Sequence, residues 1–170
     1  MASVIRTVST PSIEEYWLRS QEVTYCKERW LIPFKVTKEV RLHILQWKIS
    51  HNIYPTSIIL SKMGYRQSDK CQSCNMRETL THFFYDCFTT KQIWSEIEKK
   101  ISACTGKQIK INSVLALHGF IPGNDMSKKD YTFINQIILI GKLTISKWKY
   151  GPKRNPIEIL ESELRMRKIL

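Results

Sequence analysis

Three cysteines and one histidine fall within 17 consecutive residues, and their spacing constrains this chain more than any other feature. Residues 71–87 read CQSCNMRETLTHFFYDC, a C-x2-C-x7-H-x4-C pattern. Structural zinc sites hold the ion in a tetrahedron of thiolates and imidazoles, and a C-x2-C turn brings two sulfurs to one ion. Because the segment is short, closing it around a metal has a modest entropy cost. We therefore predict one zinc ion bound by Cys71, Cys74, His82 and Cys87.

The four predicted ligands would complete the coordination shell of the ion. A closed shell leaves no position for an activated water, so the pattern favours a structural site over the open site of a zinc hydrolase. Two other interpretations stay open from the residues alone. The cysteines could be small buried residues beside an exposed histidine. The C-x2-C pair could also be a redox pair, but the sequence lacks the strand–helix context of such pairs.

Apolar periodicity predicts an all-α fold, a compact multi-helix domain with a small zinc knuckle and a C-terminal helix. The chain has six glycines and six prolines, too few for many short strands and turns. Residues Glu78–Tyr85 are expected to form a helical turn that presents His82. The other predicted helices run over Thr10–Cys26, Val36–Ile49, Thr56–Met63, Thr89–Cys104, Ser113–Leu117 and Ser127–Lys149, and from Asn155 onward.

The helix that follows Val36 is expected to be central and largely buried. It has one apolar stripe of Val40, Ile44 and Trp47 and a second of Leu42, Leu45 and Ile49. A helix with two apolar faces is typical of a protein interior. Pro33 is expected to break the chain before this helix.

The remaining cysteines and two further tryptophans are also expected in the core. Cys26 and Cys104 lie in apolar helical stretches, and buried cysteine packs as a small hydrophobe. Trp94 and Trp148 lie, like Trp47, on apolar helical stripes.

The predicted helices divide the chain into three parts. These are an N-terminal helical segment at 1–34, a helical domain with the knuckle at 35–121, and a C-terminal helical segment packed on it at 122–170. The most apolar run, Ile134–Ile140, is far shorter than the roughly 20 residues of a membrane span. With no export signal at the N-terminus, we expect an intracellular protein of the nucleus or cytoplasm, where thiols stay reduced.

Charge indicates a polyanionic partner. The chain has 27 lysines and arginines against 15 acidic residues, a formal net charge of +12. Such an excess repels itself in a compact fold and is typical of nucleic-acid binding. Two groups of residues are the predicted contacts. The first, the knuckle patch, comprises Arg41, Lys48, Lys62, Tyr65, Arg66, Lys70 and Arg77. The second, the joint patch, comprises Lys147, Lys149, Lys153 and Arg154, with Tyr150 beside them.

The sequence offers no sign of an enzyme. Two-metal nucleotidyl transfer requires clustered carboxylates, and the four aspartates here are scattered. A glycine-rich phosphate loop is also absent from the sequence.

Several segments resemble the C-terminal zinc-binding region of the reverse transcriptases of LINE-type (non-LTR) retrotransposons, encoded by their second open reading frame. The similar segments are VTKEVRLHILQWKISHNIYPTSIILSKMG, CQSC, ETLTHFFYDC, IWSEIEKKI and ILIGKLTISKWKYGPKRNPIEILESEL, spread over residues 35–168. The resemblance implies the same four zinc ligands, and a role in holding template RNA and target DNA during target-primed reverse transcription.

These observations together predict a non-catalytic, zinc-binding domain that binds RNA, with DNA as a second ligand. Phosphate contacts would dominate its affinity, which should fall with salt and vary little with base sequence. The alternative is a protein-interaction or scaffold module in which zinc only links helices and the charge attracts an acidic protein.

Overall fold

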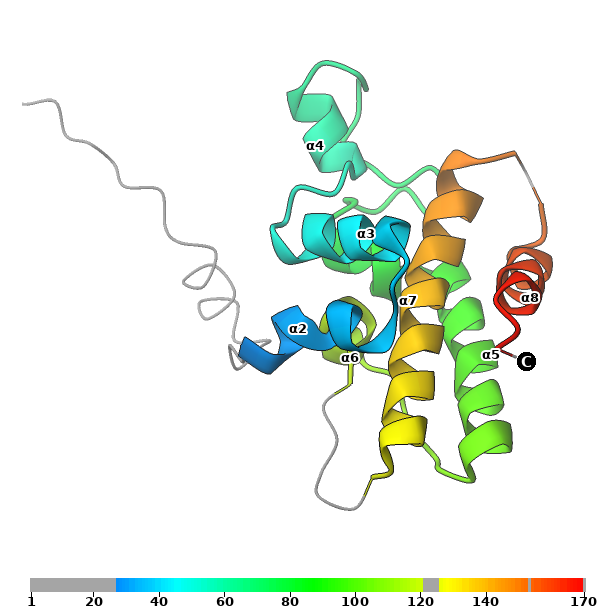
Figure 1. Cartoon of the computed structure of the whole chain (residues 1–170). Coiled ribbons are helices and arrows are strands. Elements are labelled where there is room, and N and C mark those ends of the chain that lie inside the picture. Colours follow the sequence, from blue (N-terminus) through cyan, green and yellow to red (C-terminus); the bar gives the residue numbers. More distant parts are fainter. Residues whose placement is uncertain (1–26, 121–125, 153, 170) are drawn as a thin grey trace, which may run out of the picture.

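The computed structural model describes residues 27–120, 126–152 and 154–169 (Figure 1). Its α-helices are α2 (Lys27–Val36), α3 (Val40–Ser50), α4 (Ser57–Lys62), α5 (Phe88–Thr105), α6 (Ser113–His118), α7 (Lys128–Tyr150) and α8 (Pro156–Met166). The wider helical turn η1 (His82–Asp86) precedes α5. The described residues contain no strand, only a β-bridge between Lys70 and Arg77, so the predicted all-α fold is confirmed. The helix predicted at Thr10–Cys26, with Cys26 itself, lies outside the described residues.

Helix α7 forms the centre of the fold. It packs against α2, α3 and α6 on one side and against α5 and α8 on the other (Figure 1). Its middle, from Ile137 to Ile145, is buried without interruption. Gly141 lets α5 approach closely, because a Cβ atom there would lie 2.4 Å from Cδ1 of Ile97. In the described part of the chain, no helix is long and apolar enough to cross a membrane. The division at residues 34/35 and 121/122 stays a prediction.

Pro33 does not break the chain where the sequence predicted a break. It lies inside α2, and the helix continues past it, with the Thr37 N–H donating to the Pro33 carbonyl at 3.1 Å. Proline removes one backbone donor from a helix. Ile32 and Val36 on either side of Pro33 are nevertheless buried in the core. Packing of this face therefore outweighs the lost hydrogen bond.

The prediction that α3 is buried on two faces was wrong. Leu42, Leu45 and Ile49 enter the core, but Val40, Ile44 and Trp47 are 64%, 50% and 50% exposed. Helix α3 lies at the edge of the bundle, so its packing against α2, α6 and α7 covers one face only. The Trp47 ring instead lies 4.5 Å from the ring of His51 on the surface.

The other core predictions had mixed outcomes. Trp94 is buried as predicted, and its indole N–H donates to the Phe84 carbonyl at 2.7 Å. Trp148 is half-buried, and Cys104 is exposed near the end of α5, contrary to prediction. The apolar spacing around Cys104 belongs to Ile97 and Ile101, which face the core while Cys104 faces outward.

A fully buried lysine lies in the middle of α7. The Lys142 ammonium donates to the Gln46 side-chain oxygen and, at 3.2 Å, to the Leu117 carbonyl. Burial lowers the pKa of Lys142 from 10.5 to about 7. The nearby His118 is also buried, and burial followed by the charge of Lys142 lowers its pKa to about 3.

Lys142 should make the stability of the fold depend on pH. In the unfolded chain the amine keeps its ordinary pKa, so between pH 7 and pH 10 the unfolded state binds more protons than the folded state. The free energy of unfolding therefore increases with pH in this window. Urea unfolding of the wild-type chain at pH 7 and pH 9 measures the increase. The Lys142→Met variant should show a smaller increase, and an identical increase in both proteins would contradict the assignment.

Candidate metal centre

A tight turn brings the first two cysteines together. The Cys71 N–H donates to the Met76 carbonyl at 2.7 Å, and the Asn75 N–H donates back to the Cys71 carbonyl at 2.9 Å. Asn75 adopts a positive φ of 60°, which asparagine tolerates better than most residues. The bridge between Lys70 and Arg77 closes the base of the turn. The Cys71 and Cys74 side chains therefore both project from one short loop, which is the zinc knuckle predicted from the sequence.

The wide turn η1 supplies the other two candidate ligands. The sequence predicted an ordinary helical turn here, but the Cys87 N–H donates to the carbonyl of His82, five residues earlier, at 3.2 Å. Five residues correspond to about 1.4 turns of an α-helix, which would point the two side chains to different sides. The wider turn returns Cys87 to the side of His82. Wide turns of this kind are rare in proteins, and those that occur are often found at functional sites.

Two phenylalanines anchor this turn to the protein core. Phe83 and Phe84 follow His82 directly and are fully buried. Their rings lie 5.1 Å and 4.8 Å from the buried ring of Tyr54. The position of His82 is therefore fixed by core packing as well as by the local backbone.

The four predicted ligands converge to within coordination distance of one ion. Their ligand atoms all lie within 4.8 Å of one another. The sulfurs of Cys71 and Cys87 are 3.9 Å apart, and the Cys74 sulfur is 3.2 Å from Nε2 of His82. Tetrahedral zinc with Zn–S bonds of about 2.3 Å sets its sulfurs roughly 3.8 Å apart. Three thiols and one imidazole at these separations form a donor set that fits zinc.

Burial and charge prepare the imidazole for a metal. Burial, and then the nearby Lys149 ammonium, lower the pKa of His82 below its ordinary value. The ring is therefore neutral at pH 7, the form that ligates metals. Burial raises the pKa of the Cys71 thiol to about 11. Metal binding must displace the proton of this thiol, so metal affinity should increase with pH.

A buried carboxylate, Glu78, lies against the cluster. Its side chain accepts from the Ser57 backbone N–H at 3.0 Å and from the Lys149 ammonium at 2.9 Å. Burial opposes ionisation of Glu78, but the hydrogen bonds from Lys149 and Ser57 bring its pKa below the usual value. Glu78 was not predicted as a site residue, because a lone glutamate between two cysteines and a histidine carries no signal of burial.

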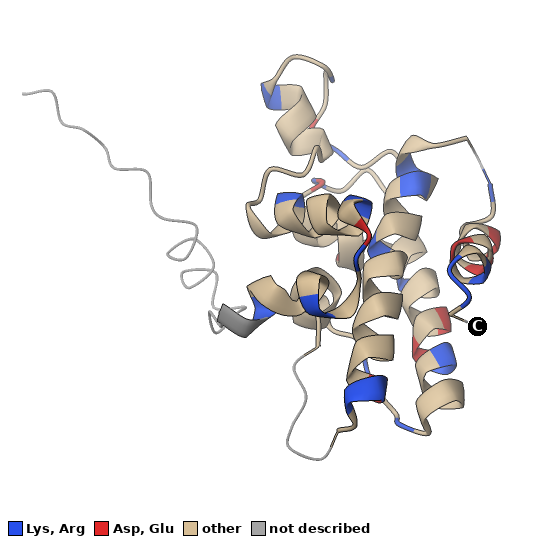
Figure 2. Ribbon diagram, viewed as in Figure 1, with Lys and Arg blue, Asp and Glu red and all other residues tan. Residues whose placement is uncertain are grey.

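Most members of the knuckle patch are exposed. Figure 2 shows basic residues on and around α4. Tyr65 is 79% exposed. Arg66 is half-buried: its guanidinium donates to the Ser57 hydroxyl at 2.7 Å and lies 5.9 Å from the centre of the Tyr150 ring. Arg77 is paired with Asp69 at 3.2 Å. Lys48 is half-buried, whereas the exposed basic members of the patch are Arg41, Lys62, Lys70 and Arg77.

The joint patch differs from the prediction at two lysines. Lys149 is buried in its ion pair with Glu78, and Lys147 pairs with the buried Glu163. Neither lysine presents an uncompensated charge to solvent. Arg154 is exposed, and Lys153 lies outside the described residues.

Two adjoining cavities at the end of α7 are lined by residues of both predicted patches. We call these two cavities together the joint groove. A cavity of about 540 Å³ is lined by Arg66, by the knuckle and by Arg154. A second of about 390 Å³ is lined by Arg41, Lys147 and Arg154. Both share Tyr150, Gly151 and Arg154 as walls. Residues separated by more than 80 positions thus line one depression beside the candidate metal centre.

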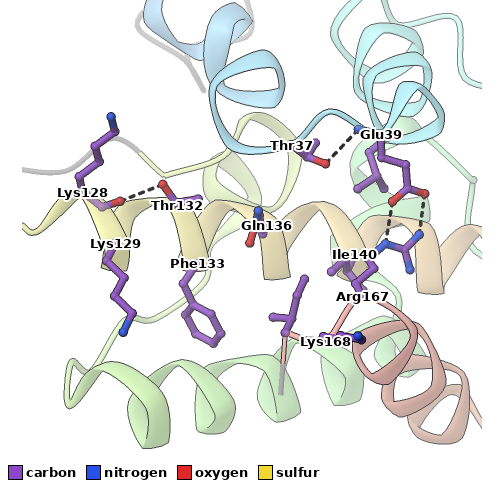
Figure 3. Close-up of a pocket in the computed structure, with 12 residues that line it drawn as sticks. Thr37, Glu39, Lys128, Lys129, Thr132, Phe133, Gln136, Ile140, Arg167 and Lys168 are labelled. Carbon is purple, nitrogen blue, oxygen red and sulfur yellow. Dashed lines mark hydrogen bonds and ion pairs between the residues drawn. The ribbon is translucent and has the colours of Figure 1, made fainter.

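A third cavity, of about 760 Å³, lies at the opposite end of α7 (Figure 3). Lys128, Lys129 and Lys168 line it, with Phe133 between them. Figure 3 also shows Arg167 held by Glu39, with separations of 2.6 Å and 2.7 Å. This basic surface was not among the patches predicted from the sequence. The adjacent Lys128 and Lys129 are a signal in the sequence for this surface. The approach of the C-terminal residues to them has no such signal.

Comparison with known proteins agrees with the geometry of the cluster. Residues 12–94 match the family described as zinc-binding in reverse transcriptase. The match contains all four candidate ligands and ends within α5, at Trp94. A search of curated proteins found no match. The family match supports a zinc-binding region of reverse-transcriptase origin.

Loss of one ligand should release the metal and weaken the fold together. We expect about one zinc per chain in the wild type, and little in His82→Ala or Cys87→Ala, because three protein ligands no longer close the tetrahedron. Both variants should also lose thermal stability, since the ligand turn carries Phe83 and Phe84 into the core. Atomic emission and circular dichroism before and after chelation measure the two effects.

Cys104→Ala is the matched control, because Cys104 is an exposed thiol outside the cluster. It should keep both the zinc and the stability of the wild type. Full zinc content in Cys87→Ala would contradict the four-ligand assignment.

Proposed function

We propose that this chain, whose residues 12–94 match a zinc-binding region of reverse-transcriptase origin, is a non-catalytic, zinc-stabilised domain that binds nucleic acid. Cys71, Cys74, His82 and Cys87 would hold the ion with all four coordination positions filled by protein. An ion held in this way supplies rigidity and no activated water. A reducing compartment, nuclear or cytoplasmic, would keep the three thiols available to the metal.

The nucleic-acid proposal rests on the joint groove, which is lined by arginines from both the knuckle patch and the joint patch. Arg41, Arg66 and Arg154 come from three separate parts of the chain and line it. Guanidinium groups pair well with phosphate. Tyr150 lies between the two cavities and is partly exposed, so it offers an aromatic edge to a base. The net charge of +12 would add long-range attraction for a polyanion.

RNA is the ligand we favour, with DNA as the second. Two cavities lined by arginines, with an aromatic side chain between them, would suit a flexible single strand better than a uniform duplex. The resemblance to LINE-type reverse transcriptases points the same way, because their C-terminal region is implicated in holding template RNA and target DNA. We therefore place this chain in that group of retroelement proteins.

Removal of groove arginines should weaken RNA binding and its salt dependence together. We expect Arg41→Ala and Arg154→Ala to lower the affinity for a labelled 20-nucleotide single-stranded RNA. Each lost phosphate contact should reduce the slope of log affinity against log salt by about 0.7. Fluorescence anisotropy at several salt concentrations measures both quantities.

Arg165→Ala is the matched control, because Arg165 is an exposed arginine on α8 outside the joint groove. It should leave both the affinity and the slope near the wild-type values. Equal effects of all three substitutions would mean that charge alone, and not the groove, attracts RNA.

One observation favours the alternative, a zinc-stabilised protein-interaction module. Large apolar side chains are exposed on α2, at Phe34, and on α3, at Val40, Ile44 and Trp47. Surfaces of this kind are common where one polypeptide packs on another. Competition with heparin separates the two functions. If RNA and heparin bind no better than an uncharged polymer at moderate salt, the nucleic-acid function is lost and the interaction module remains.

A further inference from the structure

Lys149 reaches the candidate metal centre from a part of the chain outside the family match. It lies in the last turn of α7, more than 60 residues after the last candidate ligand. Its side chain is 7% exposed, and its ammonium lies 3.7 Å from the Cys71 sulfur and 2.9 Å from a carboxylate oxygen of Glu78. The same ammonium lies 4.4 Å from the centre of the Phe83 ring. Three separate contacts therefore fix the position of this charge.

A zinc ion bound by this cluster would create a buried charge. Two positive charges on the ion and three thiolates leave one net negative charge on the centre. An uncompensated buried charge is strongly unfavourable. The ammonium of Lys149 is directly beside the sulfur of Cys71, where this charge would lie.

Glu78 and Arg66 extend the balance of charge. Arg66 donates to the Ser57 hydroxyl, which donates to Glu78, which in turn accepts from Lys149. The chain of hydrogen bonds thus runs from Arg66 to Cys71. Its two cations match the carboxylate of Glu78 and the net charge of a zinc-loaded centre. Either Arg66 or Lys149 alone would balance the charge of Glu78. The other cation is therefore available to balance the negative charge of the zinc-loaded centre.

We propose that Lys149 is a positioning residue of the metal centre, donating a hydrogen bond to the Cys71 thiolate and compensating the charge of the zinc-loaded cluster. This rests on the zinc binding proposed above. It also links zinc to the joint groove, because the next residue, Tyr150, packs its ring 5.5 Å from that of Phe83 and lines the groove. Binding of the ion at the knuckle would then fix the end of α7.

Zinc affinity of full-length variants tests the proposal. We would measure it by competition with a chromophoric chelator. Partners that hydrogen-bond to metal ligands typically contribute 10–100-fold to affinity. We therefore expect Lys149→Met to bind zinc about 10–100-fold more weakly than the wild type. Lys149→Arg, which keeps the charge, should bind more tightly than Lys149→Met. Lys147→Met is the control, because Lys147 lies on the same helix but pairs with Glu163.

A double variant separates action on the metal from simple pairing with Glu78. Glu78→Gln/Lys149→Met removes both charges of the ion pair, so a purely structural role of Lys149 predicts recovery of zinc affinity. The proposal predicts that affinity stays low in the double variant, because the Cys71 sulfur still lacks the hydrogen bond from Lys149. Recovery there, or wild-type affinity in Lys149→Met, would overturn it. Absence of zinc binding by the wild type would instead refute the proposed function.

Discussion

Convergence of four side chains on one point ties the zinc knuckle to the packing of the helical bundle. Three sulfurs and one ring nitrogen from a short segment lie within 4.8 Å of one another. Three thiolates this close together would repel one another, and a zinc ion that displaces the thiol protons would replace this repulsion with attraction. The segment brings Phe83 and Phe84 with it into the core. Metal binding and packing of the bundle are therefore coupled through adjacent residues.

The same coupling extends to the C-terminal half of the chain. Helix α7 is buried through its middle, from Ile137 to Ile145, and ends beside the cluster, where Lys149 contacts both Cys71 and Glu78. The end of α7 also separates the two cavities of the joint groove. The C-terminal end of α7 therefore borders both the basic groove proposed for a polyanion and the buried candidate metal centre. Arg41 and Arg154 of the groove are exposed, whereas Arg66 is half-buried and donates to Ser57, and Lys147 and Lys149 are held in ion pairs.

The sequence predicted those features that follow from local spacing. The C-x2-C-x7-H-x4-C pattern identified the cluster, and apolar periodicity identified α3 to α8 with close boundaries. Features set by tertiary packing were missed. Periodicity put Trp47 on an apolar stripe of α3. Whether another helix covers that stripe depends on the position of α3 at the edge of the bundle. Lys149 resembled a surface charge in a basic segment, and only the approach of α7 to Glu78 makes it buried. The wide turn at His82 likewise has no sequence signature.

X-ray absorption at the zinc edge of the purified full-length chain distinguishes a closed metal centre from an open one, because it counts the ligand atoms around the ion. We predict three sulfurs at about 2.3 Å and one nitrogen at about 2.0 Å, with no oxygen. These would be the thiolates of Cys71, Cys74 and Cys87 and Nε2 of His82. A shell with fewer sulfurs, or one containing water oxygen, would contradict a closed structural centre.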